Sequence, residues 1–306
     1  MIDFRETVEW LKEDGFCDAA AIGFGEKTAV TALFPYRLER PTTVSAAASY
    51  IDPFALRNNY REMAARLKTA AVKIRKAAGL NKSEVRIFVN SSLPEKAAAA
   101  FAGLGFCGKS TLLISPLYGV NTLIGGILIS LPAADGLSRF DGAPPSSAAR
   151  CGACRRCIDA CPVGAIGENG VDRSRCLQSL ASRSGAVPAE LLPHWDILYG
   201  CSRCRDACPY SRFNRRGVMH RRGEIDESET IGEWLQTAAE SEEAFCARFK
   251  GTALAMSWID KRALLRNAVI LSRRLGIFNE ETERVCRQYK NEFSQLLSVD
   301  IPPLLR

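Results

Sequence analysis

Residues 151–162 read CGACRRCIDACP, with cysteines at positions 151, 154, 157 and 161 and a proline directly after the last one. This is the bacterial ferredoxin run, in which three thiolates bind one four-iron cluster and the fourth binds a different cluster. Two intervening residues let neighbouring thiolates reach separate irons, and the proline ends the helix that would otherwise continue. Buried thiols or a zinc site are the alternatives, but zinc ribbons pair two CxxC knuckles and do not use this run. The stretch therefore predicts a ferredoxin-like domain.

A second cysteine motif, CSRCRDACP over residues 201–209, lacks the leading cysteine of the first. The isolated Cys176 can supply the missing thiolate. Because the last cysteine of each run binds the other cluster, the eight cysteines form two complete sites with none left over. We expect one [4Fe–4S] cluster on Cys151, Cys154, Cys157 and Cys208, and a second on Cys161, Cys176, Cys201 and Cys204.

The rest of the composition is that of a globular chain with room for two or three domains. The chain has 306 residues, of which 47% are hydrophobic and 25% charged. No apolar run approaches the roughly 18–20 residues of a membrane span, and the first residues lack the basic and apolar regions of an export signal. We therefore expect a cytoplasmic protein without membrane contact, whose cysteines stay reduced.

Hydrophobic periodicity divides the chain into three regions. The first has mixed α/β character, with helical spacing over Asn58–Gly79 and Pro94–Phe101 and strand-like runs over Thr42–Tyr50, Val85–Asn90 and Thr122–Leu131. Residues 132–150 show no periodicity and mark a boundary. The third region has apolar helical stripes over Ser228–Ala239, Ser241–Phe249 and Ile259–Leu275. We predict domains over residues 1–135, 136–222 and 223–306.

Positive charge gathers in the cysteine region. Residues 141–222 hold thirteen arginines, no lysine and seven acidic residues, and this excess accounts for most of the net charge of +7. Part of it balances the negative charge of thiolate-bound clusters. A run beyond the last ligand suits phosphate oxygens, and it comprises Arg212, Arg215, Arg216, Arg221 and Arg222. An RNA-contacting surface and a solvated basic turn are the two interpretations of this run.

A glycine-dense segment, AGLGFCGKSTLL over residues 102–113, precedes the cysteine region. In the epoxyqueuosine reductase family a segment AGLGWxGKxTLL precedes the ferredoxin module, and this chain departs from it at Phe106. The cysteine order, the Tyr199-Gly200 pair before Cys201, and the segments Phe249–Ala253 and Leu264–Ala268 also match. Over roughly residues 40–270 the chain resembles an epoxyqueuosine reductase, shortened and diverged.

The resemblance implies an α+β architecture: an N-terminal α/β, nitroreductase-like cobalamin-binding domain, the two-cluster domain and a short helical C-terminal tail. It implies a base-off cobalamin between the first two domains, which takes single electrons from the clusters and deoxygenates an epoxide in a tRNA anticodon. A low-potential electron donor is then also a partner. The expected cofactor-binding residues are Gly105, Phe106, Gly108, Lys109, Ser110, Thr111, Gly125 and Gly126.

One departure concerns the proton donor of the family, an aspartate that follows a strand. This chain has Asn90 at that position, in the stretch FVNSSLPE of residues 88–95. An amide cannot act as a general acid near neutral pH. Either Tyr50, Tyr118 or water supplies the proton, or the substrate is no longer epoxyqueuosine. His194 and His220 are expected to be surface or packing residues rather than ligands.

Two other classes of function stay open. The chain can be a two-cluster ferredoxin-type electron-transfer protein without substrate chemistry of its own. It can also be an RNA- or protein-binding module whose clusters are structural. Retention of cobalamin separates the first interpretation from these two.

Overall fold

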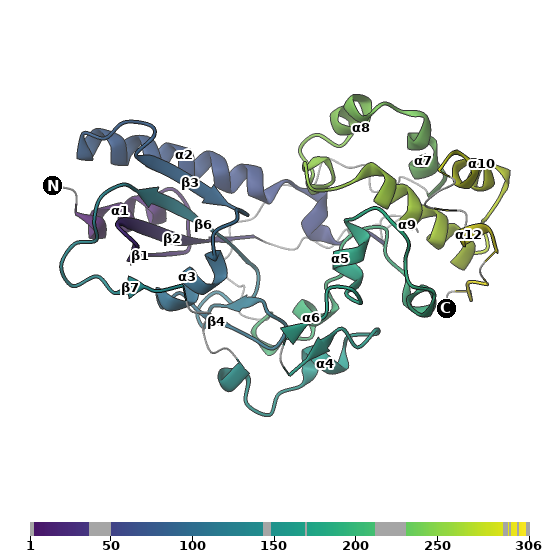
Figure 1. Ribbon diagram of the computed structural model, residues 1–306, viewed down its shortest axis with the longest axis horizontal. Coiled ribbons are helices and arrows are strands. Elements are labelled where there is room, and N and C mark those ends of the chain that lie inside the picture. Colours follow the sequence, from purple (N-terminus) through teal and green to yellow (C-terminus); the bar gives the residue numbers. More distant parts are fainter. Residues whose placement is uncertain are drawn as a thin grey trace.

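Figure 1 shows the computed structural model of the chain, with a sheet domain on one side, helices on the other, and the cysteine region below and between them. The structure describes residues 3–36, 50–142, 148–168, 170–211, 231–289, 293, 295–298 and 300–303. The long helix α2 (Asn59–Ala78) begins near the middle of the molecule and runs outward along the sheet (Figure 1).

The sheet of the N-terminal domain has five strands in the order β3-β6-β2-β1-β7. Their bounds are Asp18–Phe24 for β1, Lys27–Pro35 for β2, Val85–Val89 for β3, Thr122–Ile129 for β6 and Arg139–Phe140 for β7. Strands β3, β6, β2 and β1 pair antiparallel with their neighbours in this order, whereas β7 runs parallel to β1 at the edge of the sheet. Strands β1 and β2 form a hairpin over a two-residue turn, in which Gly25 adopts a φ of +61° that favours glycine.

Helices cover both faces of this sheet. Their bounds are Phe4–Glu13 for α1 and Glu95–Phe101 for α3. Helices α1 and α2 share one face, where Leu67 is buried with Val30. Helix α3 lies on the other face, where Ala98 is buried with Phe88. The domain is therefore a mixed α/β unit with helical layers on both sides of one sheet.

Most of the predicted elements of this domain are confirmed. The helix predicted over Asn58–Gly79 is α2, because the Asn58 side chain accepts the Arg61 N–H at 2.9 Å and Gly79 ends the helix with a φ of +66°. The other predicted helix and two of the strands agree with α3, β3 and β6 to within two residues. The predicted strand Thr42–Tyr50 lies outside the described residues except for Tyr50.

Two strands depart from the sequence expectation. The hairpin β1–β2 was not predicted, although β2 is almost entirely buried. Strand β7 lies inside residues 132–150, the segment predicted to be a boundary between domains, and it pairs with β1. The sheet therefore continues past residue 135 to Phe140.

The cysteine region consists of short elements. They are η3 (Ala148–Cys151), α4 (Arg156–Asp159), β8 (Ile166–Gly167), β9 (Gly170–Val171), α5 (Leu177–Ala181), η4 (Ala189–His194) and α6 (Arg203–Asp206). Two further short strands, β4 (Phe106–Cys107) and β5 (Leu113–Ile114), pair within the glycine-dense segment. Short elements of this kind place cysteines on turns rather than inside long helices.

The C-terminal region is helical. Its elements are α7 (Ile231–Gln236), η6 (Thr237–Ala239), α8 (Glu242–Arg248), η7 (Ala253–Ala255), α9 (Lys261–Arg274), α10 (Glu280–Gln288) and α12 (Gln295–Ser298). The three predicted helices correspond to α7 with η6, to α8 and to α9. Side-chain caps fix the last two, since Ser241 accepts the Ala244 N–H at 3.1 Å and Asp260 accepts the Arg262 N–H at 2.8 Å.

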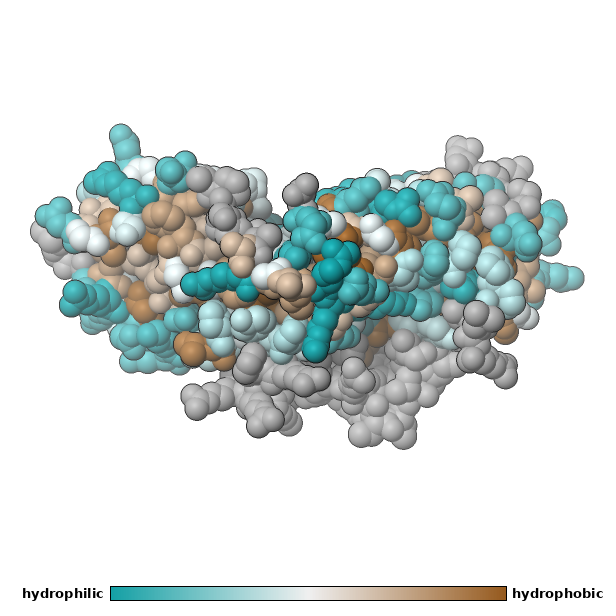
Figure 2. Space-filling model, turned by 90° about the horizontal axis from the view of Figure 1, so that it is seen from below, coloured by the Kyte–Doolittle hydropathy of each residue, from teal (hydrophilic) through white to brown (hydrophobic). Residues whose placement is uncertain are grey.

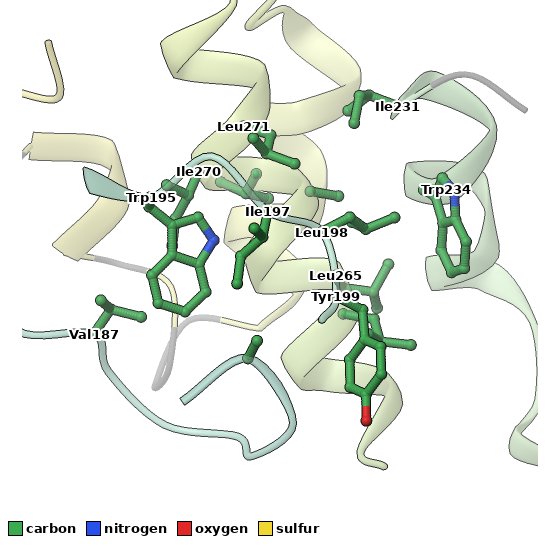
Figure 3. Packing of buried hydrophobic residues seen from close by; sticks show 14 of the residues in the cluster. Val187, Trp195, Ile197, Leu198, Tyr199, Ile231, Trp234, Leu265, Ile270 and Leu271 are labelled. Atoms are coloured by element: carbon green, nitrogen blue, oxygen red, sulfur yellow. The ribbon is translucent and has the colours of Figure 1, made fainter. Parts of the chain in front are cut away.

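The largest hydrophobic core joins this helical region to the second half of the cysteine region. Figure 3 shows Trp195, Ile197 and Leu198 packed against Ile270 and Leu271 of α9. The residue pair before the second motif is part of the same core, because Tyr199 is buried there. The predicted division at residues 222 and 223 therefore does not separate two independent cores.

The described helices include none that is both long enough and apolar enough to span a bilayer. Figure 2 shows hydrophilic side chains over most of the helical half of one face, and a wider area of weakly hydrophobic colour over the sheet half.

Candidate functional site

The two cysteine motifs fold in the same way. Both follow the pattern C-x-R-C-x-D-A-C-P, and each forms a one-turn helix, α4 or α6. The last cysteine of each motif donates its N–H to a carbonyl three residues earlier, at 3.1 Å in both cases. Proline follows each last cysteine and has no N–H to continue a helix. The repeated sequence thus produces a repeated turn that presents thiols on one side.

The eight cysteines are free thiols of intermediate exposure, and several of them lie within electrostatic reach of one another. Burial raises the pKa of Cys208, and the sulfurs of Cys157, Cys151 and Cys154 raise it further. Elsewhere, burial raises the pKa of Cys204 to about 12, with Cys201 and Cys176 as the next contributors. Cys161, Cys176 and Cys201 also pack against the same core. Cys157 also raises the pKa of Cys204 across the two expected groups, so the crossed membership and the ligation of iron both stay predictions.

The donor set of these groups fits four-iron clusters. In the part of the chain that the structure describes, no three His, Cys, Asp or Glu side chains form a site for a single metal ion. A four-iron cluster spreads its thiolates over separate irons, so its ligands do not have to converge on one point. The Ala165 N–H donates to the Cys161 sulfur at 3.2 Å, which is the kind of contact that stabilises a ligating thiolate.

The glycine-dense segment lies against the first cysteine group. Phe106, Ile114 and Val120 form a small core on which Cys151 and Cys208 pack. A Cβ added at Gly108 would lie 2.6 Å from the Ile114 Cδ1 atom and 3.4 Å from the Cys151 sulfur. Gly108 thus brings the backbone of the segment close to Ile114 and Cys151, and a larger residue would have to displace the end of the Ile114 side chain.

Lys109 ties the same segment to the cysteine region. Its ammonium is buried, donates to the Gly152 carbonyl at 3.1 Å and pairs with Glu168 at 2.9 Å. Next to it, Ser110 is buried and Thr111 has a φ of +59°, which a β-branched residue rarely adopts. Lys96 of α3 donates to the Thr111 carbonyl at 3.0 Å. The expected cofactor segment is thus held between the sheet domain and the first motif.

The three expected proton-donor positions are dispersed. Asn90 is exposed at the end of β3 with a φ of +48°. Tyr50 is half-buried, and its carbonyl accepts the Leu198 N–H at 2.8 Å. Tyr118 is half-buried on the loop between Ser115 and Gly119. Among the contacts of the described residues, none joins two of these three positions.

Sequence reasoning missed a group of aromatic residues near the start of α2. Tyr36, Phe54 and Tyr60 form a chain of ring contacts that ends at the half-exposed Trp258. Burial raises the pKa of Tyr60 well above its ordinary value, and Tyr36, Tyr199 and Glu95 lie close enough to raise it further. These residues come from distant segments, so no local sequence pattern marks them.

A buried ion pair links this aromatic group to the second motif. Asp52 pairs with Arg205, which lies between Cys204 and Cys208, at 2.9 Å. Burial disfavours the charge of Arg205, but Asp52, Tyr36 and Asp206 together outweigh this effect and raise the pKa of the guanidinium. Gly200 faces Asp52 so closely that an added Cβ would lie 2.3 Å from the Asp52 Cβ atom. The second motif is therefore fitted directly onto the chain that leads into α2.

A corrin ring needs space and hydrogen-bond partners, and the expected glycines provide neither. An added Cβ would meet Ile114 from Gly105, Met63 and Leu67 from Gly125, and Val30 and Phe88 from Gly126. These glycines are explained by the packing of the chain itself, and their contact with a corrin stays a prediction. Two hydrogen-bond acceptors of the sheet domain have no partner: the side-chain oxygens of Asn121 and Asn59 are buried without a hydrogen bond. Peripheral corrin amides are donors that fit them.

The whole arginine run of the expected RNA surface lies outside the described residues. This applies to Arg212, Arg215, Arg216, Arg221 and Arg222, and also to His220. His194 is exposed at the end of η4, as expected for a surface residue.

Comparison with known proteins agrees with this geometry. Residues 150–211 match the family described as a 4Fe-4S double cluster binding domain. An epoxyqueuosine reductase from Pseudomonas aeruginosa is 31% identical over 230 residues, which cover 72% of this chain and 60% of that protein. The chain thus spans less than two thirds of the length of this relative.

Solved structures show the same fold. The epoxyqueuosine reductase of Streptococcus thermophilus superposes with a TM-score of 0.67 at 22% identity, over 96% of this chain and 91% of that one. An epoxyqueuosine reductase with an epoxyqueuosine-modified tyrosine tRNA stem loop gives a TM-score of 0.65 at 19% identity, over 93% and 84%. With the cysteine order, the double-cluster domain and these relatives in agreement, the chain belongs to the epoxyqueuosine reductase family.

Proposed function

We propose that this chain is an iron–sulfur, cobalamin-dependent reductase that converts epoxyqueuosine in tRNA to queuosine. The observation that carries the proposal is the packing of the family's glycine-dense segment against Cys151 of the first motif and Cys208 of the second. The reaction takes two electrons and two protons: both epoxide C–O bonds break, a C=C bond forms and water leaves. The clusters deliver the electrons one at a time.

The two cysteine groups have different tasks in this proposal. The first group, on Cys151, Cys154, Cys157 and Cys208, faces the sheet domain and passes electrons to the substrate side. The second group, on Cys161, Cys176, Cys201 and Cys204, lies against the helical core and receives them from a low-potential donor. Helices α4 and α6 contact one another, so the electron path between the two clusters is short.

Cobalamin belongs to the proposal as the third redox group, in a sheet domain of the nitroreductase-like type. When bound, it supplies a low-potential metal centre that single electrons from the clusters can reduce. The Asn121 and Asn59 oxygens would accept hydrogen bonds from its amides. The ion pair between buried Lys109 and Glu168 would hold the glycine-dense segment in place beside the first motif.

For the proton we propose Tyr118 rather than Tyr50. Tyr118 lies in sequence between Ile114 and Val120, both of which belong to the core that carries Cys151 and Cys208, and Lys12 is within electrostatic reach of it. Tyr50 instead lies on the core of the helical region. Asn90 can hydrogen-bond the substrate but cannot protonate it.

We expect Asn90→Asp to raise the rate of single-turnover deoxygenation, because positioned proton transfer is typically worth ~10²–10⁴-fold. Only part of this factor should return, since the backbone at Asn90 is already in the left-handed region and fixes where the new carboxylate lies. Mass spectrometry of nucleosides from epoxyqueuosine tRNA measures the rate. An unchanged rate would mean that proton transfer from Tyr118 does not limit the reaction.

The partners in this proposal are the anticodon region of tRNA and a one-electron donor, and the location is the cytoplasm. The decisive experiment mixes epoxyqueuosine tRNA with anaerobically reconstituted, reduced protein, with and without cobalamin. Conversion should require cobalamin and be lost in Cys204→Ala, while Cys246→Ala, on an exposed helix position, converts normally. Intact clusters and bound cobalamin without conversion would overturn the proposed substrate.

A second candidate function is a two-cluster electron carrier. It is favoured by Asn90, because the loss of the family's acid removes a group that substrate chemistry needs but electron transfer does not. Two clusters without retention of cobalamin would support it.

A further inference from the structure

The arginine shared by the two cysteine motifs occupies two different environments. Arg156 and Arg203 hold the same position in the C-x-R-C-x-D-A-C-P pattern. Arg156 is exposed, whereas Arg203 is half-buried and donates from Nη1 to the Cys201 sulfur at 3.4 Å. Among the described residues, Arg203 is the one charged side chain that donates a hydrogen bond to any of the eight sulfurs. The same sequence thus gives a cationic contact to one group of thiols and none to the other.

Asp196 holds Arg203 in this orientation. It lies between the buried residues Trp195 and Ile197, and one of its oxygens pairs with the second guanidinium nitrogen of Arg203. The other oxygen is buried without a partner, and Arg274 is a second cation within its electrostatic reach. The first motif has a different arrangement, because there Arg155, not Arg156, pairs with the nearby Glu168. The inward position of Arg203 is therefore built by the helical core rather than by the motif.

We propose that Arg203 sets the reduction potential of the cluster that Cys201 binds. The inference rests on the proposed function only in requiring that the cysteines hold two four-iron clusters. Reduction adds one electron and hence one negative charge to a cluster, and hydrogen bonds to its sulfurs and nearby charge are among the factors that set its potential. A guanidinium on a ligating sulfur stabilises the reduced form more than the oxidised form. Arg203 therefore raises the potential of this cluster.

A higher potential makes this cluster easier to reduce and makes onward transfer of the electron to the other cluster less favourable. The cluster on the helical side, stabilised in its reduced form by Arg203, accepts an electron from the one-electron donor more readily. The other cluster lies on the glycine-dense segment and has no equivalent charged donor among the described residues. Arg203 is a positioning residue of the electron path, not a group that touches the substrate.

The test is a potentiometric titration under anaerobic conditions, followed by electron paramagnetic resonance, of protein with both clusters loaded. Arg203→Gln should lower the potential of one cluster, so that its ratio of reduced to oxidised form falls several-fold at a fixed potential. A tenfold fall corresponds to 59 mV for a one-electron couple. The matched control Arg156→Gln should change this ratio less than twofold. The signal that shifts must be the one missing from Cys176→Ala, which removes a ligand of the same cluster.

Two further variants protect the test against loss of folding. Arg203→Lys keeps the positive charge but lacks the forked guanidinium. The cluster of this variant should therefore have a potential between those of the unmodified protein and Arg203→Gln. If Arg203→Gln loses iron because Asp196 is left unpaired, Asp196→Asn combined with Arg203→Gln removes that charge and should still show the lowered potential. Equal shifts in Arg203→Gln and Arg156→Gln, or no shift in either, would overturn the inference. Absence of two clusters in the unmodified protein would instead overturn the proposed function.

Discussion

The two cysteine motifs are alike in sequence and local backbone, yet they belong to different parts of the molecule. The first lies on the glycine-dense segment of the sheet domain, through Cys151, Lys109 and the small core around Phe106. The second is continuous with the large core of the helical region, through Tyr199 and Trp195. The nine-residue pattern encodes the turn that presents thiols. Contacts far apart in sequence decide which neighbours each group of thiols has.

The second motif depends on two polar residues inside α9. Arg266 is 1% exposed, and its guanidinium donates to the carbonyls of Leu180, Arg183 and Gly185. Asn267 donates to the Ala181 and Leu198 carbonyls at 2.9 and 2.8 Å. These bonds satisfy carbonyls at the end of α5 and beside the residues that precede Cys201. The helical region thereby fixes the position of the second motif.

The largest expected effect is the loss of one cluster in Cys176→Ala. This variant removes a thiolate from the second group only, so it should lose about half of the iron and retain the cluster on Cys151, Cys154 and Cys157. Iron and sulfide analysis measures this, with the exposed Cys246→Ala as the control. Retention of both clusters would show that Cys176 is an ordinary half-buried thiol and would break the comparison between the two groups.

The next effect is on stability. Arg266→Ala leaves three part-buried carbonyls without their donor, at about 1–3 kcal/mol for each group that water does not reach, so we expect the free energy of unfolding to fall by roughly 3 kcal/mol. Urea unfolding followed by tryptophan fluorescence reports on Trp195 and Trp234 in the same core. Arg287→Ala removes an exposed, solvent-screened ion pair and should lower the free energy of unfolding far less. Equal costs would mean that α9 does not position the second motif.

A smaller effect is expected for the contact between the second motif and the chain leading into α2. Arg205→Gln removes the buried partner of Asp52. The free energy of unfolding should then fall by on the order of 2 kcal/mol, because the charge left on Asp52 is partly resolvated. The double variant Asp52→Asn with Arg205→Gln should recover part of this loss, because it leaves no unpaired charge. Additive losses in the double-mutant cycle would show that the pair does not couple the two segments.

The sequence predicted those features that depend on local spacing. The cysteine intervals indicated two four-thiol groups, and Asn58 and Gly79 marked the two ends of α2 because caps act within one turn. The hairpin β1–β2 was missed because β2 is buried on both faces and shows no alternation. The common core of Trp195 and α9 was missed because composition changes along the chain do not reveal which surfaces pack together. Arg203 and Arg156 could not be distinguished, since their local sequences are the same.

The central claim is that the two motifs exchange their last cysteines, so that each cluster is held by both motifs. Two double variants test it by iron content after anaerobic reconstitution. Cys151→Ala with Cys208→Ala removes two thiolates from one predicted site and should leave about half of the iron. Cys151→Ala with Cys161→Ala removes one thiolate from each predicted site, within a single motif, and should leave almost none. The reverse pattern, with half of the iron in the second variant and almost none in the first, would contradict crossed ligation and assign each cluster to its own motif.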